Sequence, residues 1–155
     1  MSLWDYATST YARPGVEAAC LALQDEHGQC VPFLLWRLWA LAEGRPVDEA
    51  LLSQAAETAM VWDEAATTPL RAIRRKLKQR FPPVSDTARA ALREELKASE
   101  LRAERLLLDT LEALTPGPAP SHAGDERVQV LAQASAAWQA PLTAADLEPL
   151  AEAVS

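Results

Sequence analysis

The segment QDEHGQC, residues 24–30, gathers the residue types in this sequence that most often take part in chemistry. It contains two carboxylates, a histidine and a cysteine, which can act as acids, bases or metal ligands. Neighbouring residues on a helix point in different directions, so these side chains do not converge on one atom. Gly28 directly after His27 instead predicts the end of a helix, where a histidine interacts favourably with free carbonyl groups. We therefore expect a helix end here and no metal or catalytic site.

No other segment supplies ligands or catalytic groups at a productive spacing. The second histidine, His122, lies among prolines and glycines, and Cys20 and Cys30 match no zinc or redox motif. We expect two reduced thiols, no metal and no cofactor. The pattern favours a protein that is not an enzyme.

Arg37 is the single charge in the apolar segment FLLWRLWALA. A buried arginine needs a carboxylate or several carbonyl groups. If the second and third helices form an antiparallel pair, Glu17 or Asp25 can supply the carboxylate. The alternative is an anion-binding arginine in an aromatic ligand pocket, which would be formed by Trp4, Tyr11, Gln24, Asp25, Trp36, Arg37 and Trp39.

A basic amphipathic helix is expected over residues 69–81. Its apolar residues are expected to lie on one side and to face the core. They are Leu70, Ile73, Leu77 and Phe81. The cations would then form either an ordinary solvated face or a binding surface for an acidic protein, nucleic acid or anionic lipid, and of these we expect a protein partner. The partner-binding residues would be Arg71, Arg74, Arg75 and Lys78.

The formal charge of -7 is unevenly distributed. Residues 1–68 carry three basic and ten acidic side chains, residues 69–105 carry eleven and five, and residues 106–155 carry one and seven. The acidic total argues against nucleic acid as the partner, since nucleic-acid binders usually show a dominant basic surface.

Composition predicts the elements that position these groups. The chain has 155 residues, 49% of them hydrophobic, with five glycines and many strong helix formers. We expect an all-α fold, a single bundle of about six helices around a central apolar helix at residues 31–44. No apolar run approaches the ~20 residues that a membrane-spanning helix needs. The start shows no signal-peptide pattern, so a cytoplasmic protein is expected.

The longest predicted helix covers residues 86–114 after the Pro82-Pro83 break. It can pack within the monomer or form a homodimer through a weak heptad seam. The seam consists of Leu92, Leu96, Ser99, Ala103, Leu106, Thr110 and Ala113.

Residues 115–125 contain three prolines and two glycines, which predicts a linker. The predicted organisation is a helical core domain at residues 1–114, this linker, and a short helical tail at residues 126–155.

Four segments resemble, in order and spacing, a family of small bacterial proteins that is known only as a domain of unknown function. They are LWDYATSTYARPGVEAACLALQDEHG, FLLWRLW, PLRAIRRKLK and LKASELRAERLLLDTLE. The resemblance covers about residues 3–113. It implies a bacterial cytoplasmic setting and brings no catalytic or binding residues.

The function expected from these patterns is that of a non-enzymatic interaction or adaptor protein that uses the basic helix 69–81. The alternative is a helical protein that binds a small or lipid-like molecule in the aromatic pocket around Arg37.

Overall fold

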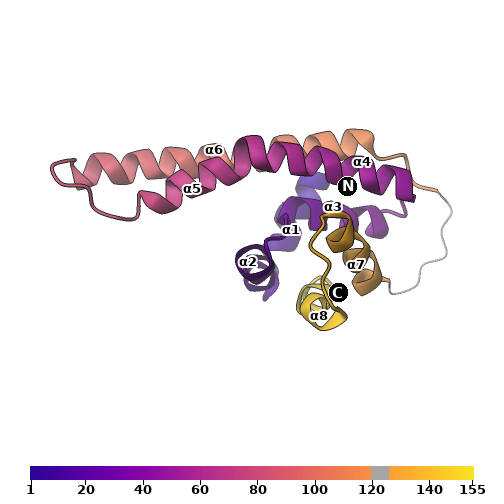
Figure 1. Cartoon of the computed structure of the whole chain (residues 1–155). Coiled ribbons are helices and arrows are strands. Elements are labelled where there is room, and N and C mark those ends of the chain that lie inside the picture. The colour runs from indigo at the N-terminus through magenta and orange to yellow at the C-terminus, as the bar shows by residue number, and fades with distance from the viewer. Residues whose placement is uncertain (120–125) are drawn as a thin grey trace.

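The computed structural model describes residues 1–119 and 126–155, and these residues form eight α-helices, one π-helix and no strand (Figure 1). The all-α fold expected from the sequence is confirmed. The helices are α1 (Leu3–Tyr11), α2 (Val16–His27), α3 (Val31–Ala42), α4 (Glu49–Trp62), the π-helix η1 (Asp63–Thr67), α5 (Thr68–Lys76), α6 (Asp86–Leu114), α7 (Arg127–Ala137) and α8 (Ala144–Ala153).

Helix α3 is the centre of the core, as its all-round apolar sequence predicts. Every residue from 31 to 40 is buried, and Phe33, Trp36 and Trp39 are fully inaccessible. Helix α3 packs against α1, α2, α4, α6 and α7. Burying side chains of this size contributes roughly 1.5–3 kcal/mol each, so α3 is the main source of cohesion.

Helix α2 differs from its predicted arrangement. It packs mainly on α8 and makes less contact with α3, so the two do not pair along their lengths as we expected. Gly28 ends α2 with φ 64°, a left-handed conformation that glycine adopts without strain, and so turns the chain away.

Helices α4, η1 and α5 run as one continuous rod beside α6 and form a long helical hairpin (Figure 1). The residue before a proline is disfavoured in the α conformation, but the rod continues past Pro69 through the π-helix. Pro69 has no N–H to donate to the preceding turn. Just before it the backbone takes the wider π turn, in which the Thr68 N–H donates to the Asp63 carbonyl five residues earlier.

The far end of this hairpin projects beyond the other helices (Figure 1). We call residues 68–100 the arm: α5, the connection at 77–85 and the first half of α6. Helix α5 packs only on η1 and α6 among the described elements, and none of its residues is buried. It ends at Lys76 rather than at residue 81, and Arg89 of α6 donates to the Leu77 carbonyl just past this end.

Helix α6 begins and ends where the sequence predicts. Ser85 caps its start by accepting a hydrogen bond from the Ala88 N–H at 3.3 Å. Leu107, Leu108 and Leu111 of its second half are buried. The first half, in the arm, buries far less apolar surface.

The tail helices α7 and α8 complete the core. Val130, Leu131, Leu147 and Leu150 belong to the same buried cluster as α3, and α7 packs along α3. The sequence left open whether the tail docks on residues 1–114, and in the structure the two segments share one buried cluster. Part of the predicted linker, together with His122, lies outside the described residues.

Within the part of the chain that the structure describes, none of the helices combines the length and the apolar character needed to cross a membrane.

Candidate functional site

Two of the four predicted partner-binding cations point into the hairpin. Arg71 Nε donates to Glu100 Oε1 at 2.8 Å, and its Nη2 donates to Glu104 Oε1 at 3.2 Å. Arg74 Nε donates to Glu100 Oε2 at 2.5 Å. The side chains of Arg71 and Arg74 are only 13% and 20% exposed. These arginines hold α5 against α6 and are not free to bind a partner.

The predicted orientation of the basic helix was therefore wrong. Ile73, expected in the core, is 50% exposed, and Phe81 is exposed as well. Leu70 and Leu77 are half buried, as are Arg71 and Arg74. The reason is that α6 presents Glu100 and Glu104 one turn apart toward α5, so the inner face of α5 combines arginines with leucines. Cations usually lie on the solvated face of a helix, and here Arg71 and Arg74 lie on the inner one while Arg75 and Lys78 stay exposed.

The two glutamates of this cluster have opposite pKa shifts. Burial disfavours ionisation of Glu100, but hydrogen bonds from Arg74 and Arg71 outweigh it and lower the pKa of this carboxyl group. Burial raises the pKa of Glu104, because its single hydrogen bond from Arg71 compensates less. Glu100 is the stable anion at the centre of the cluster.

Arg75 takes a third direction and reaches from the arm to α2. Its Nη2 lies 2.5 Å from Asp25 Oδ1, and Gln24 also donates to this carboxylate at 3.3 Å. Hydrogen bonds from Arg75 and then Gln24 lower the pKa of Asp25. Both members of the ion pair are about half exposed, so water screens it.

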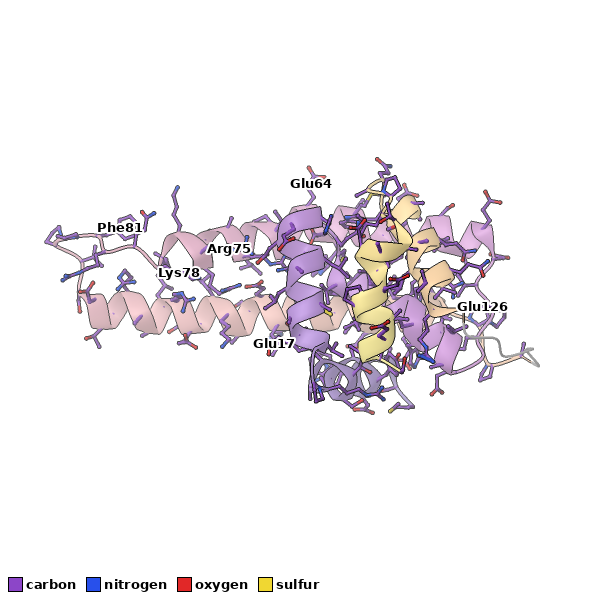
Figure 2. The ribbon with its side chains drawn as sticks, turned by 90° about the horizontal axis from the view of Figure 1, so that it is seen from below. Glu17, Glu64, Arg75, Lys78, Phe81 and Glu126 are labelled. Carbon is purple, nitrogen blue, oxygen red and sulfur yellow. The ribbon has the colours of Figure 1, made fainter. Side chains whose placement is uncertain are left out.

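Lys78, the fourth predicted cation, borders a hollow near the end of the arm, beyond the other helices. Figure 2 shows Arg75, Lys78 and Phe81 in succession toward the end of the arm. The hollow has a volume of about 500 Å³ and is lined by Lys78, Arg89, Ala90, Ala91, Arg93 and Glu94. We call it the tip hollow.

Three cations surround the tip hollow, and they differ in how many ion pairs and hydrogen bonds they form with the rest of the chain. Arg89 contacts Asp86 at 3.3 Å and the Leu77 carbonyl. Arg93 lies 3.6 Å from Glu94, and its buried Nε has no hydrogen-bond partner among the described residues. Lys78 forms no ion pair with the described residues. The tip hollow therefore keeps positive charge available.

A groove lies between α1 and α2 on one side and the hairpin on the other. Its volume is about 530 Å³, and Trp4, Tyr11 and Gln24 of the predicted pocket line it. Arg74, Lys97 and Glu104 form its charged wall. We call it the side groove.

The other members of the predicted pocket lie elsewhere. Trp36 and Trp39 are in the core, and their indole N–H groups donate to Thr115 Oγ1 at 2.8 Å and to the Met1 carbonyl at 3.0 Å. Asp25 is engaged with Arg75 beside the side groove. No aromatic pocket surrounds Arg37 among the described residues.

Arg37 is buried, as predicted, but its expected carboxylate partner was wrong. Its Nη2 donates to the amide oxygen of Gln133 on α7 at 3.3 Å, and its Nε has no partner among the described residues. Burial lowers the pKa of Arg37, and the charge of nearby Glu126 opposes this effect. Glu17 and Asp25 are not its partners because α2 does not run along α3.

The segment QDEHGQC ends helix α2 at His27, as predicted. In residues 1–119 and 126–155, no three His, Cys, Asp or Glu side chains are grouped in a way that could hold a metal ion. Cys20 and Cys30 are free and buried, and burial raises the pKa of each thiol to about 12. Neither thiol is a nucleophile near neutral pH.

The sequence of this chain matches a known protein family. The sequence profile of a family described as "Protein of unknown function (DUF2390)" matches residues 2–111, well over half of the chain. The chain belongs to the DUF2390 family. No curated protein and no solved structure matches it.

The DUF2390 match includes the whole arm and the side groove. It also includes the ion cluster, by which we mean Arg71, Arg74, Glu100 and Glu104. It ends inside α6, so α7 and α8 lie beyond it although they complete the core of this DUF2390 protein.

Sequence reasoning missed Glu100 and Glu104 as partners of the basic helix, and it missed Arg89 and Arg93. One signal was present: Glu100 and Glu104 are four residues apart and Arg71 and Arg74 are three apart, so each pair lies on one face of its helix. Which faces meet depends on the pairing of the two helices, and the sequence does not state that pairing.

Proposed function

We propose that this DUF2390 protein is a non-enzymatic interaction or adaptor protein that binds an acidic protein surface through the tip hollow. One observation carries the proposal: Lys78, Arg89 and Arg93 surround a hollow on an arm that projects away from the rest of the chain. The proposal includes the cytoplasmic setting expected from the sequence, which two free, buried thiols support.

The charge distribution supports an acidic partner. Residues 75–93, which we call the tip, contain six basic residues and one acidic residue, while the whole chain has a formal charge of -7. The tip is thus about +5 and the remainder about -12. An acidic partner is attracted to the tip and repelled elsewhere, which orients its approach.

The ion cluster at Glu100 supports the proposal because it fixes the position of α5 relative to α6 in the arm. Because Arg71 and Arg74 join α5 to α6 before any partner arrives, the cations of the tip hollow are held near their binding positions. Such preorganisation reduces the entropy lost on association.

The test is a charge reversal with a matched control. The variant carries Lys78→Glu and Arg93→Glu in the tip hollow, and the control carries Lys97→Glu and Arg102→Glu, which makes the same charge change outside the tip. Each protein is used to capture partners from cell lysate at low and physiological salt, and the captured proteins are quantified by mass spectrometry. We expect the variant to lose acidic proteins that the parent and the control retain. Equal recovery by all three would contradict the proposal.

The side groove supports a second candidate, a small amphiphilic ligand. Trp4 and Tyr11 give it aromatic walls, Leu35 and Leu108 an apolar floor, and Lys97 a cation. We expect a medium-chain fatty acid to raise the melting temperature of the parent and not that of a Thr8→Trp variant, whose indole would fill the groove. No shift with the parent would remove this candidate.

A further inference from the structure

The hairpin has an exposed apolar side that no described helix covers. Val61 of α4 is 64% exposed, Ile73 of α5 50%, and Leu92 and Leu106 of α6 47% and 49%. Isolated exposed leucines are ordinary, but four aliphatic side chains on one two-helix hairpin suggest an interface if they share one side.

Their positions show that they do. Leu92, Ser99 and Leu106 are seven residues apart and so lie along one stripe of α6. Val61 and Leu106 line the same hollow, which has a volume of about 740 Å³ and also includes Trp62. We call it the root hollow.

Ile73 lies on this side too. Residues two apart on a helix point about 200° apart, so Ile73 points away from Arg75. Arg75 reaches Asp25 on α2. Helix α2 belongs to the body of the protein, by which we mean α1, α2, α3, α7 and α8. We call the side that carries Val61, Ile73, Leu92 and Leu106 the open face.

The body covers the opposite side of the hairpin. Lys97, Glu104 and Leu108 of α6 line the side groove toward α1 and α2. In Figure 1 the other helices lie below the hairpin and none lies above it. The open face is therefore available to a second molecule.

The charges of the hairpin indicate which molecule fits. The tip, residues 75–93, has six basic residues and one acidic residue. The root, which we define as residues 48–66 and 106–114, has seven acidic residues and no basic one. Two copies in antiparallel orientation would place each basic tip beside an acidic root, whereas parallel copies would place like charges together.

We propose that this protein forms a two-fold symmetric, antiparallel homodimer through the open face, in which two hairpins make a four-helix bundle. Fifteen residues of helix separate Val61 from Lys76, which is roughly 22 Å, and the connection after α5 carries Phe81 farther toward the end of the arm. The exposed Phe81 and Val84 of one copy then reach the root hollow of the other, and Ile73 lies near the two-fold axis. A two-fold dimer uses the same surface twice, and a surface with opposite charges at its two ends suits this arrangement.

The dimer leaves the tip hollow accessible. Ala90 and Glu94, which line it, lie at helical spacing with Lys97 of the side groove, on the side of α6 away from Leu92. The inference is therefore independent of the proposed function, and either can fail without the other.

The first test measures mass in solution with a matched pair of variants. Sedimentation equilibrium of the parent is expected to give twice the chain mass of 16.9 kDa. Leu106→Glu is expected to raise the dimer dissociation constant at least about tenfold. Leu101→Glu is the control, because Leu101 is exposed to a similar degree but lies about 140° around α6 from Leu106. Melting curves establish that both variants fold.

A monomeric parent at low and physiological salt would overturn the proposal. So would a Leu106→Glu variant that remains dimeric, or a control that dissociates equally.

The second test establishes orientation. A variant with Ile73→Cys is expected to form a disulfide-linked dimer on mild oxidation, because the two copies of this residue lie near the axis. A variant with Val84→Cys is expected to cross-link not to itself but to a copy carrying Val61→Cys. Self-cross-linking of Val84→Cys would mean parallel hairpins and would contradict the antiparallel dimer.

Discussion

Glu100 is the residue on which the arm depends. It is 9% exposed and accepts hydrogen bonds from Arg71 and Arg74. Replacing it by Gln removes the charge that compensates two partly buried guanidinium groups, and we expect a loss of about 2 kcal/mol or more of folding free energy. Urea unfolding at neutral pH measures this loss. Asp25→Asn is the matched control, because the exposed Asp25–Arg75 pair is expected to contribute less than about 1 kcal/mol. Equal losses would contradict the central role of Glu100.

The sign of the pH dependence follows from the direction of the pKa shifts. The pKa of Glu100 is lower in the folded than in the unfolded protein, so its contribution is complete above its unfolded pKa of about 4.3 and is lost as the pH falls through the folded value. Glu104 has the opposite sign, because its raised pKa makes ionisation at neutral pH unfavourable to folding. We expect Glu104→Gln to be neutral or stabilising at pH 7. A loss as large as that of Glu100→Gln would contradict this assignment.

Arg37 is a buried cation whose side chain has one hydrogen-bond acceptor among the described residues, the neutral amide oxygen of Gln133. A buried charge without a close opposite charge costs free energy, and an apolar residue of similar length removes that cost. We therefore expect Arg37→Met to keep or raise the melting temperature. If Arg37 were paired with a carboxylate, as we expected from the sequence, its replacement would instead cost ~3 kcal/mol or more. Thermal unfolding distinguishes the two outcomes, and a marked decrease would contradict the structural interpretation.

At the scale of elements, the hairpin is held together differently at its two ends. Its root is fixed by buried apolar residues of α6, such as Leu107 and Leu111, whereas α5 buries no residue and depends on ion pairs. Local stability follows buried apolar contacts, so the arm is expected to open more readily than the core.

Hydrogen exchange tests this expectation. We expect the amides of α5 to exchange faster than those of α3. The difference should increase as the pH falls through the lowered pKa of Glu100, because protonation of this carboxylate removes its ion pairs. Exchange rates must be corrected for the intrinsic effect of pH, and α3 in the same sample provides the reference. Equal protection of α5 and α3 would show that the ion pairs hold the arm as firmly as a packed core.

At the scale of the molecule, the tail is part of the fold. Without α7, the surface of α3 that contains Phe33 and Arg37 would lose much of its cover, because these residues contact Trp138 and Gln133. We expect residues 1–119, which include the whole region matched to DUF2390, to lose cooperative thermal unfolding and to bind a hydrophobic dye. Adding residues 126–155 as a separate peptide should restore the transition. A cooperative transition in residues 1–119 alone would show that the core forms without the tail.

Local patterns in the sequence were sufficient to predict most of the secondary structure. Ser85 and the Pro82-Pro83 break place the start of α6, Gly28 places the end of α2, and the apolar residues around Trp36 predict a central helix. These signals act over a few residues, through hydrogen bonds at helix ends and the spacing of apolar side chains, so they can be recognised without knowing the packing.

The candidate site was predicted only in part. Lys78 borders the tip hollow, and Trp4, Tyr11 and Gln24 line the side groove, but Arg71 and Arg74 face inward and Trp36 belongs to the core. These errors share one cause: whether a polar face meets solvent or a complementary helix depends on residues distant in sequence. Glu100 is 26 residues from Arg74 and cannot be assigned to it without the hairpin.

The sequence by itself determined that this protein is helical, where most helices begin and end, and that its charge is concentrated in one basic segment, because composition and local spacing decide these properties. Only the tertiary structure decided that the basic segment is half of a projecting arm, that two of its arginines are structural, that the tail completes the core, and that one side of the hairpin is left uncovered. The physical reason is that burial and charge pairing are properties of contacts between helices, and each helix sequence is compatible with several such contacts until the whole chain selects one set.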